Sequence, residues 1–216
     1  MFEEMAEKMS AAGVIPVVTV KDVDATLEIA SKASEKGIDA LEITFRTTQG
    51  EKGHEMICEA IKAVRKNFPE LLVGAGTVIN AKLASMAKDA GAQFVVSPGI
   101  NPKTVEWCLA NGMPVFPGVA TPSDIEIALS YGLDHLKFFP AEASGGTKML
   151  RALSGPFPTV KFMPTGGINQ KNIKDYLALK NVFCCGGSWM VKADLINEGK
   201  FDEITRLTKE ALELVK

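Results

Sequence analysis

The sequence is poor in the side chains that most often hold metal ions or form disulfides. Its 216 residues contain only two histidines, His54 and His135. Zinc enzymes usually use several histidines together, so this scarcity argues against a zinc site, and we expect no metal ion. The cysteines show neither the spacing of a disulfide framework nor that of a metal site, which indicates a reducing, cytoplasmic environment. The four cysteines are Cys58, Cys108, Cys184 and Cys185.

The sequence also lacks a strong net charge and a long apolar segment. Its 24 basic and 26 acidic side chains leave a formal net charge of −2, which gives no general attraction to nucleic acid or anionic lipid. Any anionic ligand must therefore be held by a local site. The longest apolar runs, such as Gly13–Val20, are too short to span a bilayer, and the acidic start, Met1–Glu7, is unlike a signal peptide. We expect neither a nucleic-acid partner nor a membrane partner.

Short runs of β-branched and aromatic residues alternate with helical patterns along the chain. Such alternation implies a parallel sheet, and eight strand–helix units imply closure into a (β/α)8 TIM barrel. The length and the 46% of hydrophobic residues fit one domain over residues 1–216. An open doubly wound sheet is the alternative, but no Gly-x-Gly-x-x-Gly follows the first strand. The predicted strands are Val14–Val20, Ala40–Phe45, Leu71–Val78, Gln93–Ser97, Pro114–Val119, His135–Phe139, Val160–Pro164 and Val182–Cys185.

Helix start and stop signals accompany these strands. Asp22 precedes a helical pattern over Val23–Glu35, and Gly37 follows it. Asn169 is expected to open a helix over Gln170–Leu179. The first dozen residues predict an extra amphipathic helix that plugs the bottom of the barrel. Its apolar face consists of Phe2, Met5 and Met9.

Polar side chains interrupt the second predicted strand on one face only. Alternation along residues 41–46 places Glu42, Thr44 and Arg46 together. The other face is apolar and must be covered by helices, so the polar face should point into the barrel mouth. A buried carboxylate near such a mouth is a natural general base. The competing interpretation is a purely structural ion pair between Glu42 and Arg46.

A lysine lies inside the otherwise apolar sixth strand. Lys137 shares its face with His135 and Phe139. A buried ammonium is costly unless it is paired or neutral, and the neutral amine is a nucleophile. Two interpretations stay open: Lys137 forms a salt bridge with Glu42, or it forms a Schiff base with a carbonyl substrate. A nearby Glu42 favours the second, because Schiff-base chemistry needs a proton-transfer group.

Glycine and proline gather at the carboxyl ends of the predicted strands, where barrels of this type carry their active sites. Two such segments, Thr165-Gly166-Gly167 and Gly186-Gly187-Ser188, follow the seventh and eighth strands. Glycines there let backbone N–H groups approach an anion, and a following helix N-terminus adds its positive end. The loops after these strands are the recurrent phosphate site of barrels, so we expect a phosphate there.

Six motifs follow one another in a fixed order over nearly the whole chain. They are Leu41-Glu42-Ile43-Thr44-Phe45-Arg46-Thr47, Gly74-Ala75-Gly76-Thr77-Val78, Ser97-Pro98-Gly99, Lys137-Phe138-Phe139-Pro140-Ala141-Glu142, Pro164-Thr165-Gly166-Gly167-Ile168 and Gly186-Gly187-Ser188-Trp189. The set resembles the KDPG/KHG aldolases, which act on 2-dehydro-3-deoxy-6-phosphogluconate or 4-hydroxy-2-oxoglutarate. The resemblance implies a class I aldolase on a (β/α)8 barrel, usually a homotrimer, that needs no cofactor.

The resemblance also implies a role for each matching residue. The lysine of the sixth strand forms the Schiff base in this family, which matches Lys137. The glutamate of the Leu-Glu-x-Thr-x-Arg segment is the general acid/base, which matches Glu42. The remaining matches are Arg46 and Thr77 at the pyruvate carboxylate, Pro98 and Phe139 lining the pocket, Thr165 beside the substrate hydroxyls, and Gly166, Gly167, Gly187 and Ser188 at the phosphate.

The reaction that the resemblance implies is reversible cleavage of 2-dehydro-3-deoxy-6-phosphogluconate to pyruvate and glyceraldehyde 3-phosphate, in the Entner–Doudoroff pathway of carbohydrate metabolism. A second hypothesis is an aldolase for the 6-phosphogalactonate epimer or for unphosphorylated 4-hydroxy-2-oxoglutarate. Ser188 and the paired glycines favour a phosphorylated substrate. A third is a catalytically silent phosphosugar-binding barrel, against which Lys137 and Glu42 argue. Departures from the family pattern are Asn101, Ala120 and a longer segment at 47–54.

Overall fold

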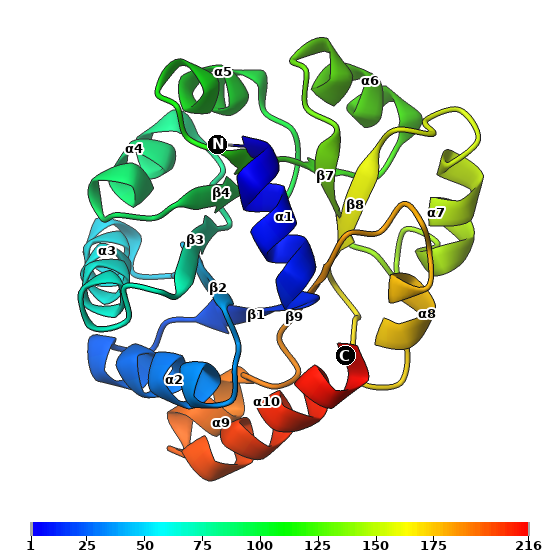
Figure 1. Ribbon diagram of the computed structural model, residues 1–216. Helices are drawn as coiled ribbons and strands as arrows, with labels where there is room; N and C mark the ends of the chain where they lie inside the picture. The colour runs from blue at the N-terminus through cyan, green and yellow to red at the C-terminus, as the bar shows by residue number, and fades with distance from the viewer. Residues whose placement is uncertain (1, 216) are drawn as a thin grey trace.

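The computed structural model describes residues 2–215, so the predicted domain 1–216 extends beyond it by one residue at each end. Strands and helices alternate along the chain (Figure 1). The strands are β1 (Val14–Thr19), β2 (Ala40–Thr44), β3 (Leu72–Gly76), β4 (Phe94–Val96), β5 (Val115–Phe116), β6 (Gly118–Val119), β7 (His135–Phe138), β8 (Lys161–Pro164) and β9 (Cys185–Gly187). The helices are α1 (Phe2–Ala12), α2 (Val23–Glu35), α3 (Gly50–Asn67), α4 (Ala81–Asp89), α5 (Pro102–Ala110), α6 (Pro122–Ser130), α7 (Gly146–Leu153), α8 (Ile173–Leu177), α9 (Ala193–Asn197) and α10 (Phe201–Val215).

The paired strands run parallel and form two sheets. One sheet has the order β5-β4-β3-β2-β1-β9, and the other has the order β6-β7-β8. Isolated parallel bridges join Phe162 to Val182 and Thr165 to Gly186, so β8 also contacts the segment that leads into β9. Figure 1 shows the strands at the centre and the helices α2 to α10 around them. The predicted α/β class with parallel strands is confirmed.

Two predicted strands differ from the observed ones by more than one or two residues at an end. Pro117 divides the predicted fifth strand into β5 and β6, because proline has no N–H to donate to a neighbouring strand. The predicted eighth strand, Val182–Cys185, is wrong in position: β9 covers Cys185–Gly187 and pairs with residues 14–16 of β1. Strand preference favours the residues before Cys185 over two glycines, whereas the pairing with β1 decides the actual register.

One predicted helix is confirmed and one is too long. Asp22 opens α2, since its Oδ1 accepts a hydrogen bond from the N–H of Ala25 at 2.7 Å. The expected helix over Gln170–Leu179 is wrong in extent, because α8 covers only Ile173–Leu177. The side chains of Asn169 and Asn172 donate to the carbonyl of Gly167 at 2.9 and 3.1 Å, and these bonds hold the preceding segment in turns.

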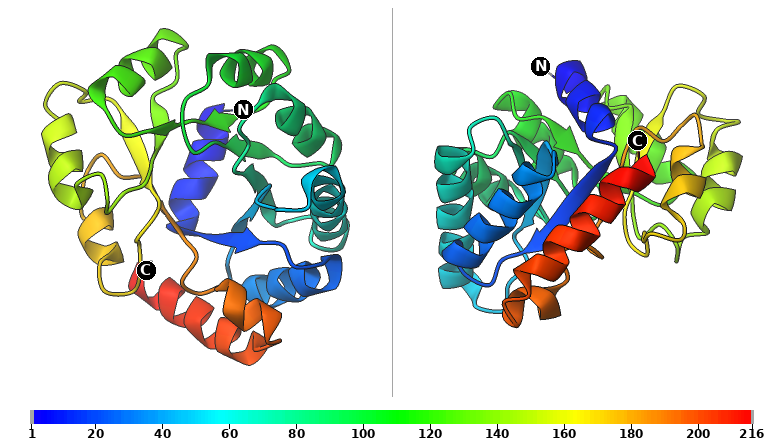
Figure 2. Two further views of the ribbon diagram at one scale, coloured as in Figure 1. Left: turned by 180° about the vertical axis from the view of Figure 1, so that it is seen from behind. Right: turned by 60° about the horizontal axis from the view of Figure 1, so that its bottom comes forward.

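The N-terminal helix covers one end of the strands. Figure 1 shows α1 crossing the middle of the molecule, and the right view of Figure 2 shows it at one end of the strands. Met5 and Met9 of α1 are buried in a cluster with Phe94, Phe116 and Phe183, and the Phe2 ring stacks on that of Phe116 at 5.1 Å. The prediction of an apolar plug under the strands is confirmed.

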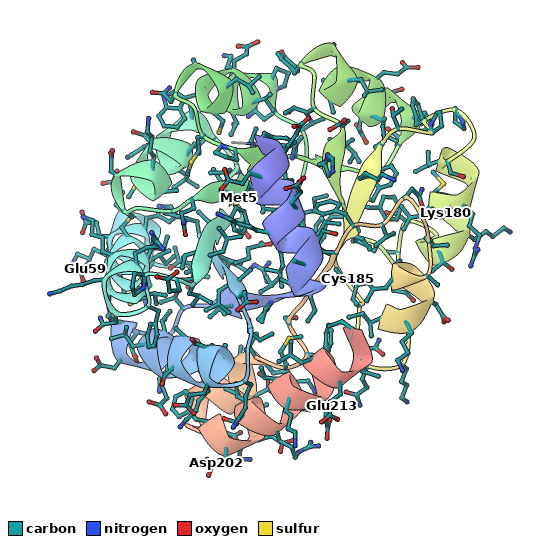
Figure 3. The ribbon with its side chains drawn as sticks, viewed as in Figure 1. Met5, Glu59, Lys180, Cys185, Asp202 and Glu213 are labelled. Carbon is teal, nitrogen blue, oxygen red and sulfur yellow. The ribbon has the colours of Figure 1, made fainter. Side chains whose placement is uncertain are left out.

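The larger core lies between the strands and the surrounding helices. Leu41, Ile43 and Phe45 belong to it, so the apolar face of β2 is covered by helices as expected. By contrast, the charged side chains of Glu59 and Asp202 lie at the outer edge of the molecule (Figure 3). No helix in residues 2–215 combines the length and the apolar composition needed to cross a membrane.

Candidate active site

A cavity of about 370 Å³ opens at the carboxyl ends of the strands. Ten side chains or glycines predicted for the site line this one cavity: Arg46, Thr77, Pro98, Lys137, Phe139, Thr165, Gly166, Gly167, Gly187 and Ser188. They come from the ends of β2, β3, β4, β7, β8 and β9, which lie far apart in the sequence. The prediction that these residues meet at one end of the strands is therefore confirmed, whereas the role of each stays a prediction.

Three residues of the cavity wall were not predicted: Val17, Ile168 and Gly186. Ile168 and Gly186 belong to the two glycine motifs, so the motif itself carried the signal. Val17 lies directly beside Glu42 in the register of β1 and β2. A single sequence does not reveal that register, so the strand pattern alone does not place Val17 at the cavity.

Lys137 and Glu42 form a buried pair. Their side chains are 5% and 1% exposed, and Nζ of Lys137 lies 3.7 Å from Oε1 of Glu42. Nζ of Lys137 also lies 5.0 Å from the centre of the Phe139 ring. Glu42 pairs with Lys137 across the strands, and this contact replaces the Glu42–Arg46 pair that the sequence left open as an alternative.

Glu42 lies behind Lys137 and is not part of the cavity wall. Among residues 2–215, no group donates a hydrogen bond to either of its carboxylate oxygens. Buried carboxylates usually accept several such bonds, so both oxygens of this one stay open to a hydrogen bond from a ligand. Gly76 makes room for it, because a Cβ added there would lie 2.6 Å from both Cγ and Cδ of Glu42.

Thr44 and Arg46, the other two polar residues predicted for this face, lie in different environments. Arg46 follows the strand, is exposed and lines the cavity, where its guanidinium is available to an anion. Thr44 is fully buried, and its hydroxyl donates to the carbonyl of Val18 at 2.9 Å. Thr44 therefore does not line the cavity, since it is fully buried and a backbone acceptor on β1 satisfies its hydroxyl.

Thr77 has an unusual backbone at the cavity wall. Its φ of 57° lies in the left-handed region, which a β-branched residue adopts only at a cost. Strain of this kind is typical of functional sites, where surrounding structure holds a residue in place. This observation agrees with the predicted contact between Thr77 and a substrate.

Glycine backbone forms another part of the cavity wall. Gly166 and Gly167 have φ values of 94° and 85°, which glycine alone adopts readily. The helices that follow the two glycine motifs begin at Ile173 and Ala193, several residues further along the chain. The expected helix N-terminus beside the anion is thus not formed directly after either motif, and backbone N–H groups remain the available donors.

Groups elsewhere in the fold offer less chemistry. A second cavity of about 380 Å³ lies at the opposite end, beside α1 and His135, and has no buried nucleophile on its wall. Burial raises the pKa of the Cys108 thiol to about 11, which leaves it unreactive at neutral pH. Among residues 2–215, no group of three or more histidine, cysteine or carboxylate side chains is arranged to hold a metal ion. Asn101, one of the departures from the family pattern, caps α5.

Comparisons with known proteins identify relatives over almost the full chain. The sequence model of the KDPG and KHG aldolase family matches residues 5–207. The 2-dehydro-3-deoxy-phosphogluconate aldolase of Haemophilus influenzae is 44% identical over 214 residues, which cover 99% of this chain and 98% of the relative. The KHG/KDPG aldolase of Escherichia coli is 43% identical over 212 residues, covering 98% and 96% of the two chains.

Solved structures agree with these sequence relationships. A KDPG aldolase from Legionella pneumophila, with pyruvate captured at low pH as a covalent carbinolamine intermediate, superposes with a TM-score of 0.88 at 40% identity, covering 95% and 96% of the chains. The aldolase of Zymomonas mobilis with 3-phosphoglycerate gives a TM-score of 0.89 at 38% identity, covering 99% and 97%. With its family motifs gathered around one cavity and its relatives matching from end to end, this chain belongs to the KDPG and KHG aldolase family.

Proposed function

We propose that this protein is a class I aldolase that reversibly cleaves 2-dehydro-3-deoxy-6-phosphogluconate to pyruvate and glyceraldehyde 3-phosphate. The observation that carries the proposal is the buried amine of Lys137 on the cavity wall, 3.7 Å from Glu42 Oε1. The names of the Haemophilus and Escherichia relatives support the substrate. The carbinolamine in the Legionella aldolase supports covalent attack by an amine.

Lys137 starts the reaction as a nucleophile. Its neutral amine attacks the C2 ketone to give a carbinolamine, and loss of water then gives a cationic imine. When the C3–C4 bond breaks, the imine accepts the electron pair and becomes an enamine, while the C4 oxygen becomes the carbonyl of the departing aldehyde. The enamine takes up a proton at C3, and hydrolysis of the resulting imine releases pyruvate and restores the amine.

Glu42 transfers the protons. It accepts the proton of the C4 hydroxyl during cleavage and returns a proton to C3 of the enamine. Because Glu42 lies behind Lys137 and not on the cavity wall, a bridging water carries the proton between the carboxylate and C4. The absence of competing hydrogen bonds to Glu42 from residues 2–215 supports this role.

The remaining cavity residues bind the two ends of the substrate. Arg46 neutralises the carboxylate with the help of Thr77 and holds the keto acid in line for attack. Pro98 and Phe139 line the middle of the pocket. At the other end Thr165 lies beside the substrate hydroxyls, and the phosphate contacts Gly166, Gly167, Gly187 and Ser188. Binding energy from the remote phosphate orients the bond that reacts.

Cleavage of 4-hydroxy-2-oxoglutarate is the second candidate activity. The Escherichia relative is named for both 4-hydroxy-2-oxoglutarate and 2-dehydro-3-deoxy-6-phosphogluconate. Values of kcat/KM for these two compounds and for the 6-phosphogalactonate epimer rank the three substrates. A catalytically silent protein, by contrast, gives no product in a single-turnover assay.

The assembly that we infer is a homotrimer of closed (β/α)8 barrels in the cytoplasm, each barrel being one domain over residues 1–216. The bridges from Phe162 to Val182 and from Thr165 to Gly186 support closure on one side. On the other side, β5 and β6 are separated only by Pro117, which supports a continuous strand between the two sheets. Light scattering on the purified protein measures the mass of the assembly, and a monomer contradicts the trimer.

Trapping the covalent intermediate tests the proposed activity. Incubation with pyruvate and borohydride should leave a stable reduced adduct on Lys137, which peptide mass mapping locates. Lys137→Ala should lose both the adduct and aldol cleavage while it remains folded. An adduct on a different lysine, or no adduct at all, refutes the class I mechanism.

A further inference from the structure

Glu142 ends the Lys-Phe-Phe-Pro-Ala-Glu motif, yet it neither lines the cavity nor takes part in the mechanism above. Its carboxylate accepts a hydrogen bond from the hydroxyl of Tyr176 on α8. Tyr176 is fully buried. Burial, together with the hydrogen bond to Glu142, raises the pKa of Tyr176. The hydroxyl therefore remains protonated and keeps donating to Glu142 throughout the physiological pH range.

The stem of Glu142 lies directly against the glycine backbone of the cavity. A Cβ added to Gly167 would lie 2.7 Å from Cβ of Glu142, so no side chain separates the two residues. The backbone N–H of Glu142 donates to the carbonyl of Gly166 at 3.1 Å. On the other side of the glycines, the amides of Asn169 and Asn172 hold the carbonyl of Gly167.

Glycines with positive φ are intrinsically mobile and must be ordered before they present N–H groups to an anion. If they are ordered only on binding, the ligand bears that entropic cost and its affinity falls. The contacts of Glu142 order Gly166 and Gly167 in advance. The hydrogen bond from Tyr176 also holds the carboxylate in one direction, which fixes the stem that lies on Gly167.

We propose that Glu142, held by Tyr176, is a positioning residue that pre-orders the Gly166–Gly167 backbone for the phosphate end of the substrate. The proposal rests on the function proposed above. It predicts that the two ends of the cavity respond differently to loss of this contact. Affinity for a substrate that carries the phosphate should depend on the Glu142–Tyr176 contact, whereas the chemistry of pyruvate at Lys137 should not.

Steady-state kinetics on two disruptive variants tests this difference between the phosphorylated substrate and pyruvate. In Tyr176→Phe and in Glu142→Ala, KM for 2-dehydro-3-deoxy-6-phosphogluconate should rise by about 10-fold, as expected for one lost charge-assisted hydrogen bond. Hydrogen exchange of the pyruvate methyl group, which needs no phosphate site, should keep its rate and its KM. Tyr131→Phe is the matched control, because Tyr131 donates to Glu106 at 2.9 Å on the surface, in a tyrosine–glutamate contact outside the cavity wall.

A conservative variant separates positioning from general stability. Glu142→Gln keeps the stem and an acceptor for Tyr176, so it should restore KM to nearly the wild-type value. Glu142 is exposed, and its removal therefore leaves a folded protein even if Tyr176→Phe does not fold. An unchanged KM for the phosphorylated substrate in Glu142→Ala, or equal changes for this substrate and for pyruvate, overturns the proposal. Failure of the proposed function itself looks different, since the wild type then forms no adduct and cleaves no substrate.

Discussion

Gly76→Ala should inactivate the protein by displacing Glu42, although the substitution removes no catalytic side chain. The added Cβ would lie 2.6 Å from Cγ and Cδ of Glu42. Carbon atoms prefer a separation of about 3.5 Å or more, so the Glu42 side chain must move by about 1 Å. A misplacement of that size costs about 100-fold in rate when it affects a group that must be oriented for reaction. The overpacking should also lower the free energy of unfolding by about 1–3 kcal/mol.

The matched control for this variant is Gly74→Ala. Gly74 lies two residues earlier on the same face of β3, and a Cβ there would meet the ring of Phe94 instead of Glu42. Both variants should be destabilised in urea unfolding. Only Gly76→Ala should lose aldol cleavage and pyruvate methyl exchange per folded molecule. Full activity in folded Gly76→Ala, or an equal loss of activity in both variants, refutes the reasoning about Glu42.

Four further outcomes follow from the same structure. Glu42→Gln should slow pyruvate methyl exchange, followed by NMR, by roughly 10²–10⁴-fold, while borohydride still labels Lys137; unchanged exchange in the folded variant removes Glu42 from the mechanism. Thr121→Ala removes the capping box of α6 and should lower the free energy of unfolding by about 1 kcal/mol, which an unaltered urea midpoint would contradict. Burial and the hydrogen bond to Glu142 raise the pKa of Tyr176, so the contribution of this tyrosine to stability is complete below its pKa in the unfolded chain, about 10. Above that pH the free energy of unfolding should fall by about 1.4 kcal/mol per pH unit. Urea unfolding from pH 9 to 12 should show this fall in the wild type and a shallower one in Tyr176→Phe. EDTA should leave activity unchanged, since the iminium ion supplies the electron sink that a metal supplies in other aldolases; a loss that zinc restores is the opposing result.

Strand alternation carried most of the information about the site in the sequence. The apolar face of β2 and the isolated Lys137 were sufficient to predict that Glu42 and Lys137 face the interior together, because side chains on a strand have only two directions. Their contact at 3.7 Å joins β2 to β7. The sequence showed that both residues were anomalous in apolar strands, and the resemblance to a family supplied their roles.

The errors arose where contacts distant in sequence outweighed local preference. Gly186 and Gly187 are poor strand formers, yet they extend β9 because Ile15 and Pro16 of β1 pair with them. Thr44 alternates correctly with Glu42 but donates to the carbonyl of Val18, an acceptor that only the three-dimensional register provides. Local patterns in a single sequence contain neither contact.

The Glu42–Lys137 pair has a consequence for thermal stability. Two ionisable groups are buried there at 3.7 Å, and among residues 2–215 the carboxylate accepts no hydrogen bond. Apolar residues of similar volume in place of a buried ion pair are often neutral or stabilise a protein by about 1–4 kcal/mol. A double replacement by methionine and leucine should thus give an inert protein that melts no lower than the active one. By this reasoning the pair serves the reaction and adds nothing to thermal stability.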